Sequence, residues 1–442
     1  MDRKMAVDKH RKLILDTERY IWKNPETGYK EVKTSAYMAE KFRELGYDLV
    51  MAEGITGFYT DLDTGRPGPT LLILGELDSI LCPEHPESDP VTGAVHSCGH
   101  HAQSAALLGV AAALKEPGML DDLCGRIRLC AVPAEELLEL EYRSQLKEEG
   151  KIKYFGGKVE FLYRGYFDGV DIAFMVHTAP AFGVRPGMVG CLTKTITYKG
   201  IAAHAGRAPW DGKNALYAAT CGLNAVNAIR ETFNESDIIR VHPIITGGGA
   251  MVNAIPEKVT LESYVRGASF DAIAKANQKV NRALCGAALS IGVNIDITDI
   301  PGYAPLKNDP NMMSLVAEAA REAIPEYPFY TYPDVATGST DMGDLSCIMP
   351  VVHPYAAGSA GHAHGSDFQI VDPVAACVGN AKLQLEMAHI LLCNGAQRAK
   401  QIIADFKPVF ASKEEYFAYT DQLNCSGERI KYTEDGLAMI KA

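Results

Sequence analysis

The chain has 442 residues, a formal net charge of -12, and 47% hydrophobic and 22% charged residues. This length and composition predict an ordinary globular protein of two or three domains. The negative charge argues against nucleic acid or an anionic membrane as a partner, because a polyanion would be repelled. The N-terminal residues are charged, no apolar run is long enough for a membrane span, and the 11 cysteines follow no framework spacing. We therefore expect a cytoplasmic protein with reduced thiols.

Segments typical of helices and strands alternate through the first part of the chain. Helical periodicity or small-residue helical composition marks residues 4–22, 34–45 and 102–114, and strand-like apolar runs mark residues 58–62, 70–74, 125–132 and 171–176. This order of elements predicts an α/β fold with a mainly parallel sheet that is covered on both faces.

The sequence pattern changes near residue 190. Residues 191–198 alternate between polar and apolar types, which is typical of an antiparallel strand with one wet face. A helix, two strands, a helix and a last strand follow at residues 214–230, 240–245, 258–265, 271–289 and 293–297. This β-α-β-β-α-β order predicts a four-stranded, two-helix α+β domain. We therefore expect a first domain at residues 1–190 and 303–442, interrupted by an insert at residues 191–302.

Cys98 and His100 are separated by a single glycine, which lets the backbone turn tightly so that both ligand atoms can converge on one point. The pair lies where a loop enters a predicted helix, and the positive end of that helix favours the thiolate form of Cys98. Alone, the pair is also compatible with a buried thiol beside an exposed imidazole.

Further polar side chains directly follow predicted buried strands, namely Asp78, the pair Glu135 and Glu136, and His177. Ligand sites in open α/β sheets collect at the carboxyl ends of the strands. Adjacent carboxylates at a strand end point to opposite sides, so one can bind a metal while its neighbour faces a water molecule. The glutamates could instead begin a solvated acidic helix, and His177 could simply cap its strand.

A histidine pair, His362 and His364, lies in a loop rich in Gly and Ser and offers a further donor, unless that loop is only solvated. One of these two histidines completes a donor set sufficient for two divalent ions, with Cys98, His100, Glu136 and His177. Glu135 is then left as a free base. Two metals that activate a water molecule, with a carboxylate to take its proton, hydrolyse amides.

In these motifs the sequence resembles the M20 metallopeptidases, and within them the amidohydrolase branch of aminoacylases, indole-3-acetyl-amino acid hydrolases and p-aminobenzoyl-glutamate hydrolase. Residues 95–100 match the His-x-Cys-Gly-His signature of the branch, and residues 133–136 match its Pro-Ala-Glu-Glu motif. The resemblance runs from residues 22–28 to the helix after His364. It implies a zinc-peptidase-like catalytic domain with the insert as a lid and dimerisation domain.

The resemblance also implies roles for the residues already singled out. It implies metal ligands at Cys98, His100, Glu136, His177 and His364, and a general base at Glu135. His364 is preferred to His362 because it matches a His-x-x-x-Phe pattern that ends at Phe368. Asp78 corresponds to a catalytic-site aspartate that supports the ligands without binding metal itself.

The insert carries residues expected to contact the substrate. His204 lies in a stretch that resembles the lid motif of the family, whose histidine holds the substrate carbonyl or the tetrahedral oxyanion. Asn253, in an Asn-x-x-Pro stretch after a glycine turn, would contact the substrate. Arg266 suits a bidentate substrate carboxylate and equally suits a surface ion pair. His101 and Gln103 stand where the branch usually has Asp and His, at positions not expected to bind metal directly.

We therefore expect an amidohydrolase with two divalent ions, Mn²⁺ or Zn²⁺, that cleaves an N-acyl or N-aroyl amino acid or a dipeptide. An exposed sheet edge in the insert predicts a homodimer. Two alternatives stay open. A cysteine hydrolase with Cys98 as nucleophile and His100 or His101 as base would need no metal, but it leaves Glu135, Glu136 and His177 unexplained. A metal-bound binding protein of the same fold would have lost its turnover.

Overall fold

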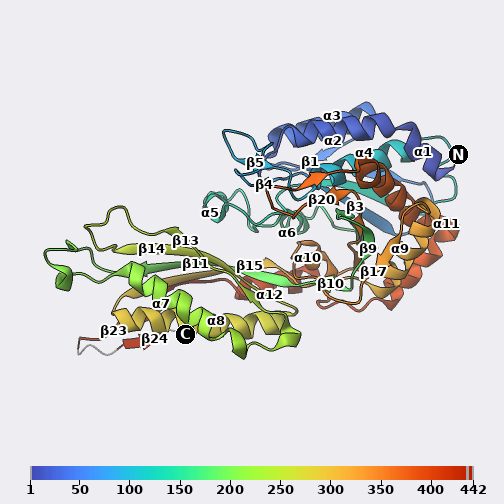
Figure 1. Cartoon of the computed structure of the whole chain (residues 1–442). Coiled ribbons are helices and arrows are strands. Elements are labelled where there is room, and N and C mark those ends of the chain that lie inside the picture. The colour runs from blue at the N-terminus through green and yellow to red at the C-terminus, as the bar shows by residue number, and fades with distance from the viewer. Residues whose placement is uncertain (1, 435–437, 441–442) are drawn as a thin grey trace. The chain divides into compact units, whose positions relative to one another are not determined.

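The computed structural model (Figure 1) describes residues 2–434 and 438–440. Its contacts divide the chain into two units. The first comprises Met1–Gly187, Leu306–Ala336 and Thr340–Lys413, and the second comprises Met188–Pro305, Thr337–Ser339 and Glu414–Ala442. The tail from Glu414 was expected to complete the first domain; it belongs to the second unit instead.

A six-stranded sheet in the order β1-β2-β6-β3-β7-β18 lies at the centre of the first unit. The parallel strands are β3 (Thr70–Glu76), β6 (Arg126–Val132), β7 (Ile172–Phe174) and β18 (Val351–Val352), and the antiparallel edge is formed by β2 (Phe58–Asp63) and β1 (Val50–Met51). All residues of β3 after Thr70 are buried, as expected for a strand covered on both faces. The predicted mainly parallel α/β fold is confirmed.

Helices surround this sheet: α1 (Arg3–Lys9), α2 (Arg11–Trp22), α3 (Val32–Glu44), α4 (His100–Leu114), α5 (Leu140–Glu148), α6 (Gly157–Tyr163), α9 (Pro310–Ala323), α10 (Met342–Ser346) and α11 (Asn380–Asp405). Both α2 and α3 pack on α4 (Figure 1). Every residue of α4 is buried. Its many alanines allow close packing, and a Cβ added to Gly75 of β3 would lie 3.1 Å from Leu107 Cδ2 of α4.

Short strands line the loops around the carboxyl ends of the main sheet. A second sheet has the order β17-β9-β19-β8, from Phe329–Thr331, Phe182–Val184, Tyr355–Ala356 and His177–Thr178. Two small pairs are β4 with β5 (Ile80–Leu81 and Ala94–Val95) and β20 with β21 (Ser359–Ala360 and Gln369–Ile370). These strands fix the loops that carry the polar residues singled out in the sequence.

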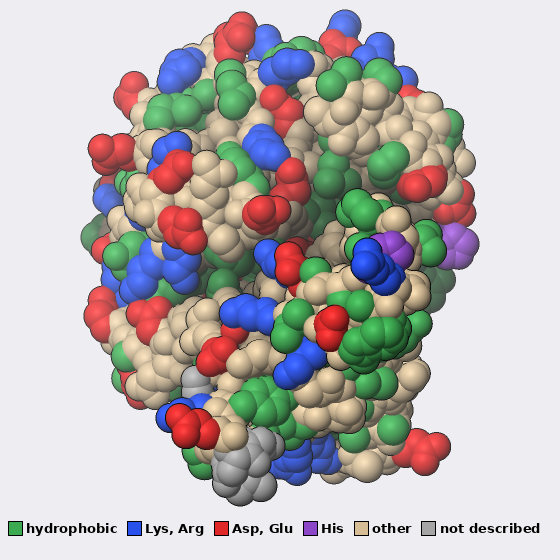
Figure 2. Space-filling model, turned by 90° about the vertical axis from the view of Figure 1, so that its left-hand side faces the viewer, with side chains coloured by type: hydrophobic (Ala, Val, Ile, Leu, Met, Phe, Trp, Pro, Cys, Tyr) green, Lys and Arg blue, Asp and Glu red, His purple; other side chains and the backbone are tan. Residues whose placement is uncertain are grey.

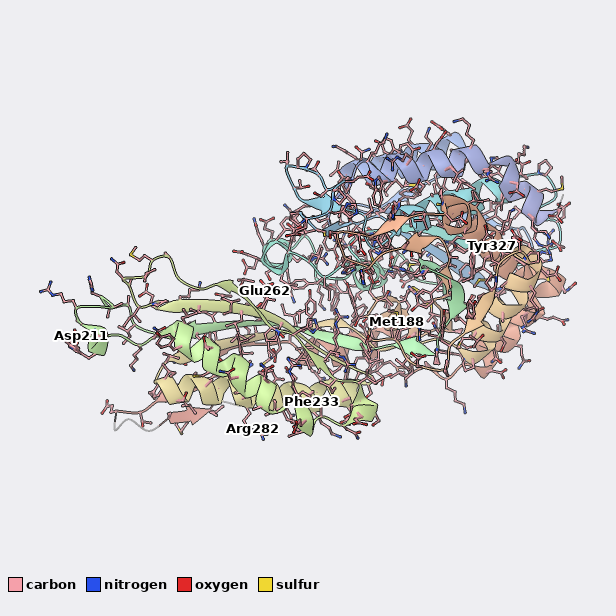
Figure 3. All side chains as sticks on the ribbon, in the orientation of Figure 1. Met188, Asp211, Phe233, Glu262, Arg282 and Tyr327 are labelled. Atoms are coloured by element: carbon pink, nitrogen blue, oxygen red, sulfur yellow. The ribbon has the colours of Figure 1, made fainter. Side chains whose placement is uncertain are left out.

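The second unit is an antiparallel sheet covered by two helices. The order is β12-β14-β11-β15-β22, with β13 also paired to β14. The bounds are Gly190–Lys199 for β11, Ala215–Ala228 for α7, Arg240–Val241 for β12, Ile244–Gly247 for β13, Lys258–Gly267 for β14, Phe270–Ile291 for α8 and Asn294–Tyr303 for β15. The predicted β-α-β-β-α-β order is therefore present, except that the strand expected at residues 240–245 is divided into β12 and β13. Figure 3 labels Glu262 on β14 and Arg282 on α8.

The edge strand β22 (Cys425–Glu428) was not predicted. It pairs with β15 through Asp296 to Asp299 and so adds the tail of the chain to this sheet. Its four residues, Cys-Ser-Gly-Glu, have no apolar alternation, so the sequence carries no local strand signal there. The remaining tail elements are α12 (Lys413–Gln422) and the paired strands β23 (Ile430–Tyr432) and β24 (Ala438–Ile440).

Charged side chains of both signs lie on the surface of the protein. On the face shown in Figure 2, acidic and basic side chains are interspersed among apolar ones. Searched for membrane spans, the described residues contain no helix that is both long and apolar enough to cross a bilayer.

Candidate metal centre

The turn between Cys98 and His100 depends on glycine. Gly99 has a φ of 90°, in the left-handed region that other residues rarely adopt. A Cβ at this position would lie 2.8 Å from Thr178 Cβ, and the Thr178 hydroxyl donates a hydrogen bond to the Gly99 carbonyl, 3.1 Å away. Helix α4 begins directly after this turn, so the turn places Cys98 and His100 beside each other.

Cys98, His100 and His177 form the first donor group, with their ligand atoms all within 4.8 Å of one another. Cys98 Sγ lies 3.5 Å from His177 Nε2. The Nδ1–H group of His100 donates to the Asp78 backbone carbonyl at 2.9 Å, and that of His177 donates to the Thr178 carbonyl at 2.8 Å. Because a carbonyl can only accept, Nδ1 carries the proton in both rings. Both Nε2 atoms are thereby turned toward Cys98 as potential ligands.

Cys98, Glu136 and His364 form a second donor group of the same dimensions, so Cys98 belongs to both. His364 Nε2 lies 2.9 Å from Glu136 Oε1. The His364 backbone has a φ of 65°, and its N–H donates to the Ser97 carbonyl at 2.9 Å. His362, in contrast, is 88% exposed at its side chain and pairs with Asp367 at 2.8 Å.

Asp78 connects the two groups without joining either. Its Oδ1 lies 3.2 Å from His100 Nδ1, and its Oδ2 accepts a hydrogen bond from the Glu136 backbone N–H at 2.8 Å. The carboxylate is fully buried. One side chain therefore orients a donor of the first group and the backbone of a donor of the second.

Glu135 is buried beside the donors, with Oε2 4.0 Å from His100 Nε2. Burial, and then the neighbouring carboxylates of Glu76 and Glu136, raise the pKa of Glu135 well above that of an ordinary glutamate. Burial acts to raise the pKa of Glu136, its neighbour in the chain, but the imidazoles of His364 and His100 and a hydrogen bond from Cys98 together outweigh burial and lower it. The pKa values of these two adjacent carboxyl groups are thus shifted in opposite directions, as expected for an acid–base group next to a ligand.

The other donors have shifted pKa values as well. Burial and Glu136 act to raise the pKa of the Cys98 thiol, but the imidazoles of His100 and His177 outweigh them and lower it to about 6. The charge of Glu136 raises the pKa of His364 to about 11. The donors therefore balance anions against protonated imidazoles, and a divalent ion would take the place of those protons. One thiolate, one carboxylate and three imidazoles fit two such ions.

A buried scaffold holds the turn that carries both glutamates. Ala134 has a φ of 57°, and its backbone N–H donates to Glu31 Oε1 at 2.8 Å. The buried guanidinium of Arg143 donates to the carbonyls of Ala134 at 3.4 Å, of Phe155 at 2.5 Å and of Glu136. These contacts fix the backbone just after β6.

The sequence reasoning missed these scaffold residues, as well as Glu76, Lys158 and Asp341, which form a buried ion-pair network next to His100. Glu76 had a usable signal. It ends a buried strand two residues before Asp78, on the same face of the strand. Glu31, Arg143, Lys158 and Asp341 had none, because their partners lie far away in the sequence.

The residues predicted to contact substrate lie in the second unit. His204 Nδ1 accepts from the backbone N–H groups of Gly206 at 3.2 Å and Arg207 at 3.1 Å, so Nε2 carries the proton of the ring. The Asn253 carbonyl accepts from the Ala205 N–H at 2.9 Å. Their roles toward a substrate stay predictions.

Arg266 is half-buried on β14. Its Nη1 lies 3.5 Å from the Thr337 carbonyl, and the guanidinium lies 5.5 Å from the centre of the Tyr264 ring. Its Nε is buried without a hydrogen-bond partner, and no carboxylate of the described residues forms an ion pair with it. Both interpretations of Arg266, a contact with a substrate carboxylate and a surface ion pair, stay predictions.

A parallel α/β sheet whose loops collect sulfur, nitrogen and oxygen donors beside a spare buried carboxylate defines a metal-dependent hydrolase. The model of peptidase family M20/M25/M40 matches residues 58–382, which is more than half of the chain. The chain belongs to this family, and it is a hydrolase of amide bonds.

Three similar proteins illustrate the range of the family. The Xaa-Arg dipeptidase of Mus musculus is 28% identical over 353 residues, covering 76% of this chain and 74% of the relative. The N-acetyl-L-cysteine deacetylase of Bacillus subtilis is 29% identical over 332 residues, covering 71% and 73%. A solved Bacillus subtilis protein, described as a dinuclear metal binding peptidase from the M20 family, shares the fold with a TM-score of 0.64, 20% identity and coverage of 87% and 99%.

Proposed function

We propose that this chain uses two divalent ions, Mn²⁺ or Zn²⁺, to cleave N-acyl or N-aroyl amino acids or dipeptides in the cytoplasm. The proposed ligands are Cys98, His100, Glu136, His177 and His364. The observation that carries the proposal is that two donor groups share Cys98, because a shared thiolate suits a pair of neighbouring ions. The dipeptidase and deacetylase relatives support the substrate class.

When bound, the ions would polarise the scissile carbonyl and lower the pKa of water. Glu135 is the proposed general base. Its carboxyl group is buried beside the donors, with Oε2 4.0 Å from His100 Nε2, so in its ionised form it can accept a proton from the attacking water and later deliver that proton to the leaving amine. Asp78 would keep His100 and Glu136 oriented throughout.

The proposal assigns His204, Asn253 and Arg266 to the substrate. The fixed tautomer of His204 leaves an Nε2–H group that can donate to an oxyanion. The guanidinium of Arg266, whose Nε has no hydrogen-bond partner, suits the carboxylate of an amino acid, and Asn253 would contact the substrate. The second unit, as a lid, would bring these groups to the bound substrate when it closes.

We also propose a homodimer formed through the second unit. Strand β13 is exposed along its whole length, and Ile244 and Ile245 are 62% and 41% exposed. An exposed apolar edge strand is a template for pairing with a second chain. Pairing of two copies about a two-fold axis would cover it.

The function is tested by a hydrolysis screen with acetyl-, benzoyl-, aminobenzoyl- and indoleacetyl-amino acids and dipeptides, with Mn²⁺ or Zn²⁺ added. At least one class should be cleaved, and Glu135→Gln should lower kcat by about a thousandfold or more with nearly unchanged metal content. The exposed Glu141→Gln serves as the matched control and should keep full activity.

Unchanged turnover in Glu135→Gln would contradict the assignment of the base. The lowered thiol pKa and the contact of Cys98 with His177 keep a cysteine hydrolase as the second candidate. Full turnover after exhaustive chelation would establish that candidate. A folded, metal-loaded protein that cleaves no member of the screen would point to a binding protein.

A further inference from the structure

Glu76 is a buried carboxylate for which the proposed set of ligands has no use. It is the last residue of β3, and its side chain is fully buried. One oxygen, Oε1, accepts a hydrogen bond from Lys158 Nζ at 2.5 Å. The other, Oε2, is buried without a hydrogen-bond partner and lies 3.3 Å from His100 Nε2. A buried carboxylate oxygen that accepts no hydrogen bond is costly, so its position favours a cation beside it.

The charges around Glu76 do not balance. Lys158 is fully buried and also forms an ion pair with Asp341, whose second oxygen accepts from the Lys158 backbone N–H at 2.8 Å. Among these three side chains, one buried cation therefore lies between two buried carboxylates, which leaves one negative charge. A cation on the Oε2 side would neutralise that charge.

The position of Oε2 shows which of the two proposed ions Glu76 would contact. Ligand atoms of Glu76, His100 and Glu135 all lie within 4.8 Å of one another. His100 uses Nδ1 to donate to Asp78, so its Nε2 is the atom available to an ion, and this atom also has no hydrogen-bond partner. Two ligand atoms without a hydrogen bond, one nitrogen and one oxygen, thus lie 3.3 Å apart, a separation that two ligands of the same ion can have.

We propose that Glu76 is an additional ligand, through Oε2, of the ion that His100 binds. Lys158 and Asp341 are then positioning residues, because they hold the Oε1 side of the carboxylate and leave Oε2 directed at the metal. With Glu76 included, the ligand set contains a second carboxylate, so it is harder and more negatively charged than the set of one thiolate, three imidazoles and Glu136. Such a set favours Mn²⁺ more than the set without Glu76 does. This inference rests on the proposed metal centre.

The test compares metal-free wild-type protein with Glu76→Gln during titration with Co²⁺, followed by calorimetry and by visible absorption. Wild type should bind two ions. In Glu76→Gln, one ion should bind at least about a hundredfold more weakly, and its visible absorption band should change because the coordination of that ion has changed. Glu386→Gln is the matched control, because Glu386 is also a buried glutamate with one cationic partner, Arg3. It should match wild type in both measurements.

An absorption spectrum of Glu76→Gln identical to wild type at saturation would overturn the proposal, since a residue that only positions others leaves the ligand set intact. If the variant does not fold, the Co²⁺-loaded wild-type crystal decides. An Oε2-to-ion distance of about 2.0–2.2 Å supports ligation, and a distance above about 3 Å overturns it. A wild-type protein that binds no ion would contradict the metal centre itself, so the two failures are distinguishable.

Discussion

Cys98 is the residue on which both donor groups depend, because its Sγ belongs to each of them. His177 belongs only to the first group and His364 only to the second. Loss of the shared thiolate therefore affects both ions, whereas loss of either histidine leaves one group complete. This difference distinguishes a two-ion site with a shared ligand from a single-ion site.

We predict that Cys98→Ala weakens binding of both ions by a factor of about one hundred or more, and that His364→Ala weakens only one. Equilibrium dialysis with metal analysis measures the stoichiometry of each variant. His362→Ala is the control and should bind two ions, since His362 pairs with Asp367 at the surface. Two tightly bound ions in Cys98→Ala would exclude the sharing.

Glu31 makes stability depend on pH. Burial, and then the charge of Asp78, raises its pKa from 4.5 to about 8. Between these two values the unfolded chain has lost the proton that the folded chain keeps, so the stability from this group is complete below pH 4.5 and is lost as pH rises toward 8. The loss amounts to at most about 1.4 kcal/mol per pH unit.

Glu31→Gln should therefore reduce the decline in the free energy of unfolding between pH 5 and pH 8. Urea denaturation at several pH values measures this free energy. The exposed Glu141→Gln variant should follow wild type across the same range. Parallel curves for Glu31→Gln and wild type would show that Glu31 titrates normally in the folded protein.

At the level of elements, the site is built where strands end and helices begin. β3, β6 and β7 are followed by Asp78, by the two glutamates and by His177, and α4 begins at His100. These positions could be predicted from sequence, because buried strands are recognisable as apolar runs and the residues just after them share one edge of the sheet. The order of the elements in the second unit was predictable for the same reason.

Other parts could not be predicted because they depend on contacts between distant segments. Lys158 pairs with Asp341 across 183 residues, and Arg143 acts on carbonyls that no pattern marks. Strand β22 joins its sheet only because the edge of β15 is available to it. Its own sequence has too little β propensity to identify it.

The turn at Gly99 gives a prediction for an element. Gly99→Ala places a Cβ 2.8 Å from Thr178 Cβ at a φ of 90°. We expect a loss of about 1–3 kcal/mol in the free energy of unfolding and weaker metal binding, because the turn sets the positions of Cys98 and His100. Calorimetric melting and metal titration measure the two effects. Unchanged values in both would mean that the turn tolerates a side chain.

Gly286, in the middle of α8, is a glycine that alanine should replace without a steric clash. It is exposed, and a Cβ there would meet nothing within 4 Å. Gly286→Ala should raise the free energy of unfolding by up to about 1 kcal/mol, because alanine favours a helix more than glycine does. Denaturant unfolding measures the change, and a clear destabilisation would contradict the described packing of α8.

At the level of the whole molecule, the proposed dimer predicts that a charge on the exposed edge of β13 separates the copies. Ile244→Lys should leave the fold intact and shift the protein from dimer to monomer, because edge lysines block strand pairing. Light scattering coupled to size-exclusion chromatography measures the mass. Val91→Lys is the control, since Val91 is 91% exposed in the first unit. A monomeric wild type, or a dimeric Ile244→Lys, would contradict this interface.

Turnover as a function of bound metal shows whether catalysis depends on the two ions. Protein stripped by chelation is titrated with Mn²⁺ or Zn²⁺ while hydrolysis of an N-acyl amino acid is followed. We predict no turnover without ions, and activity that rises until two equivalents are bound. Full activity in the stripped protein would contradict this prediction.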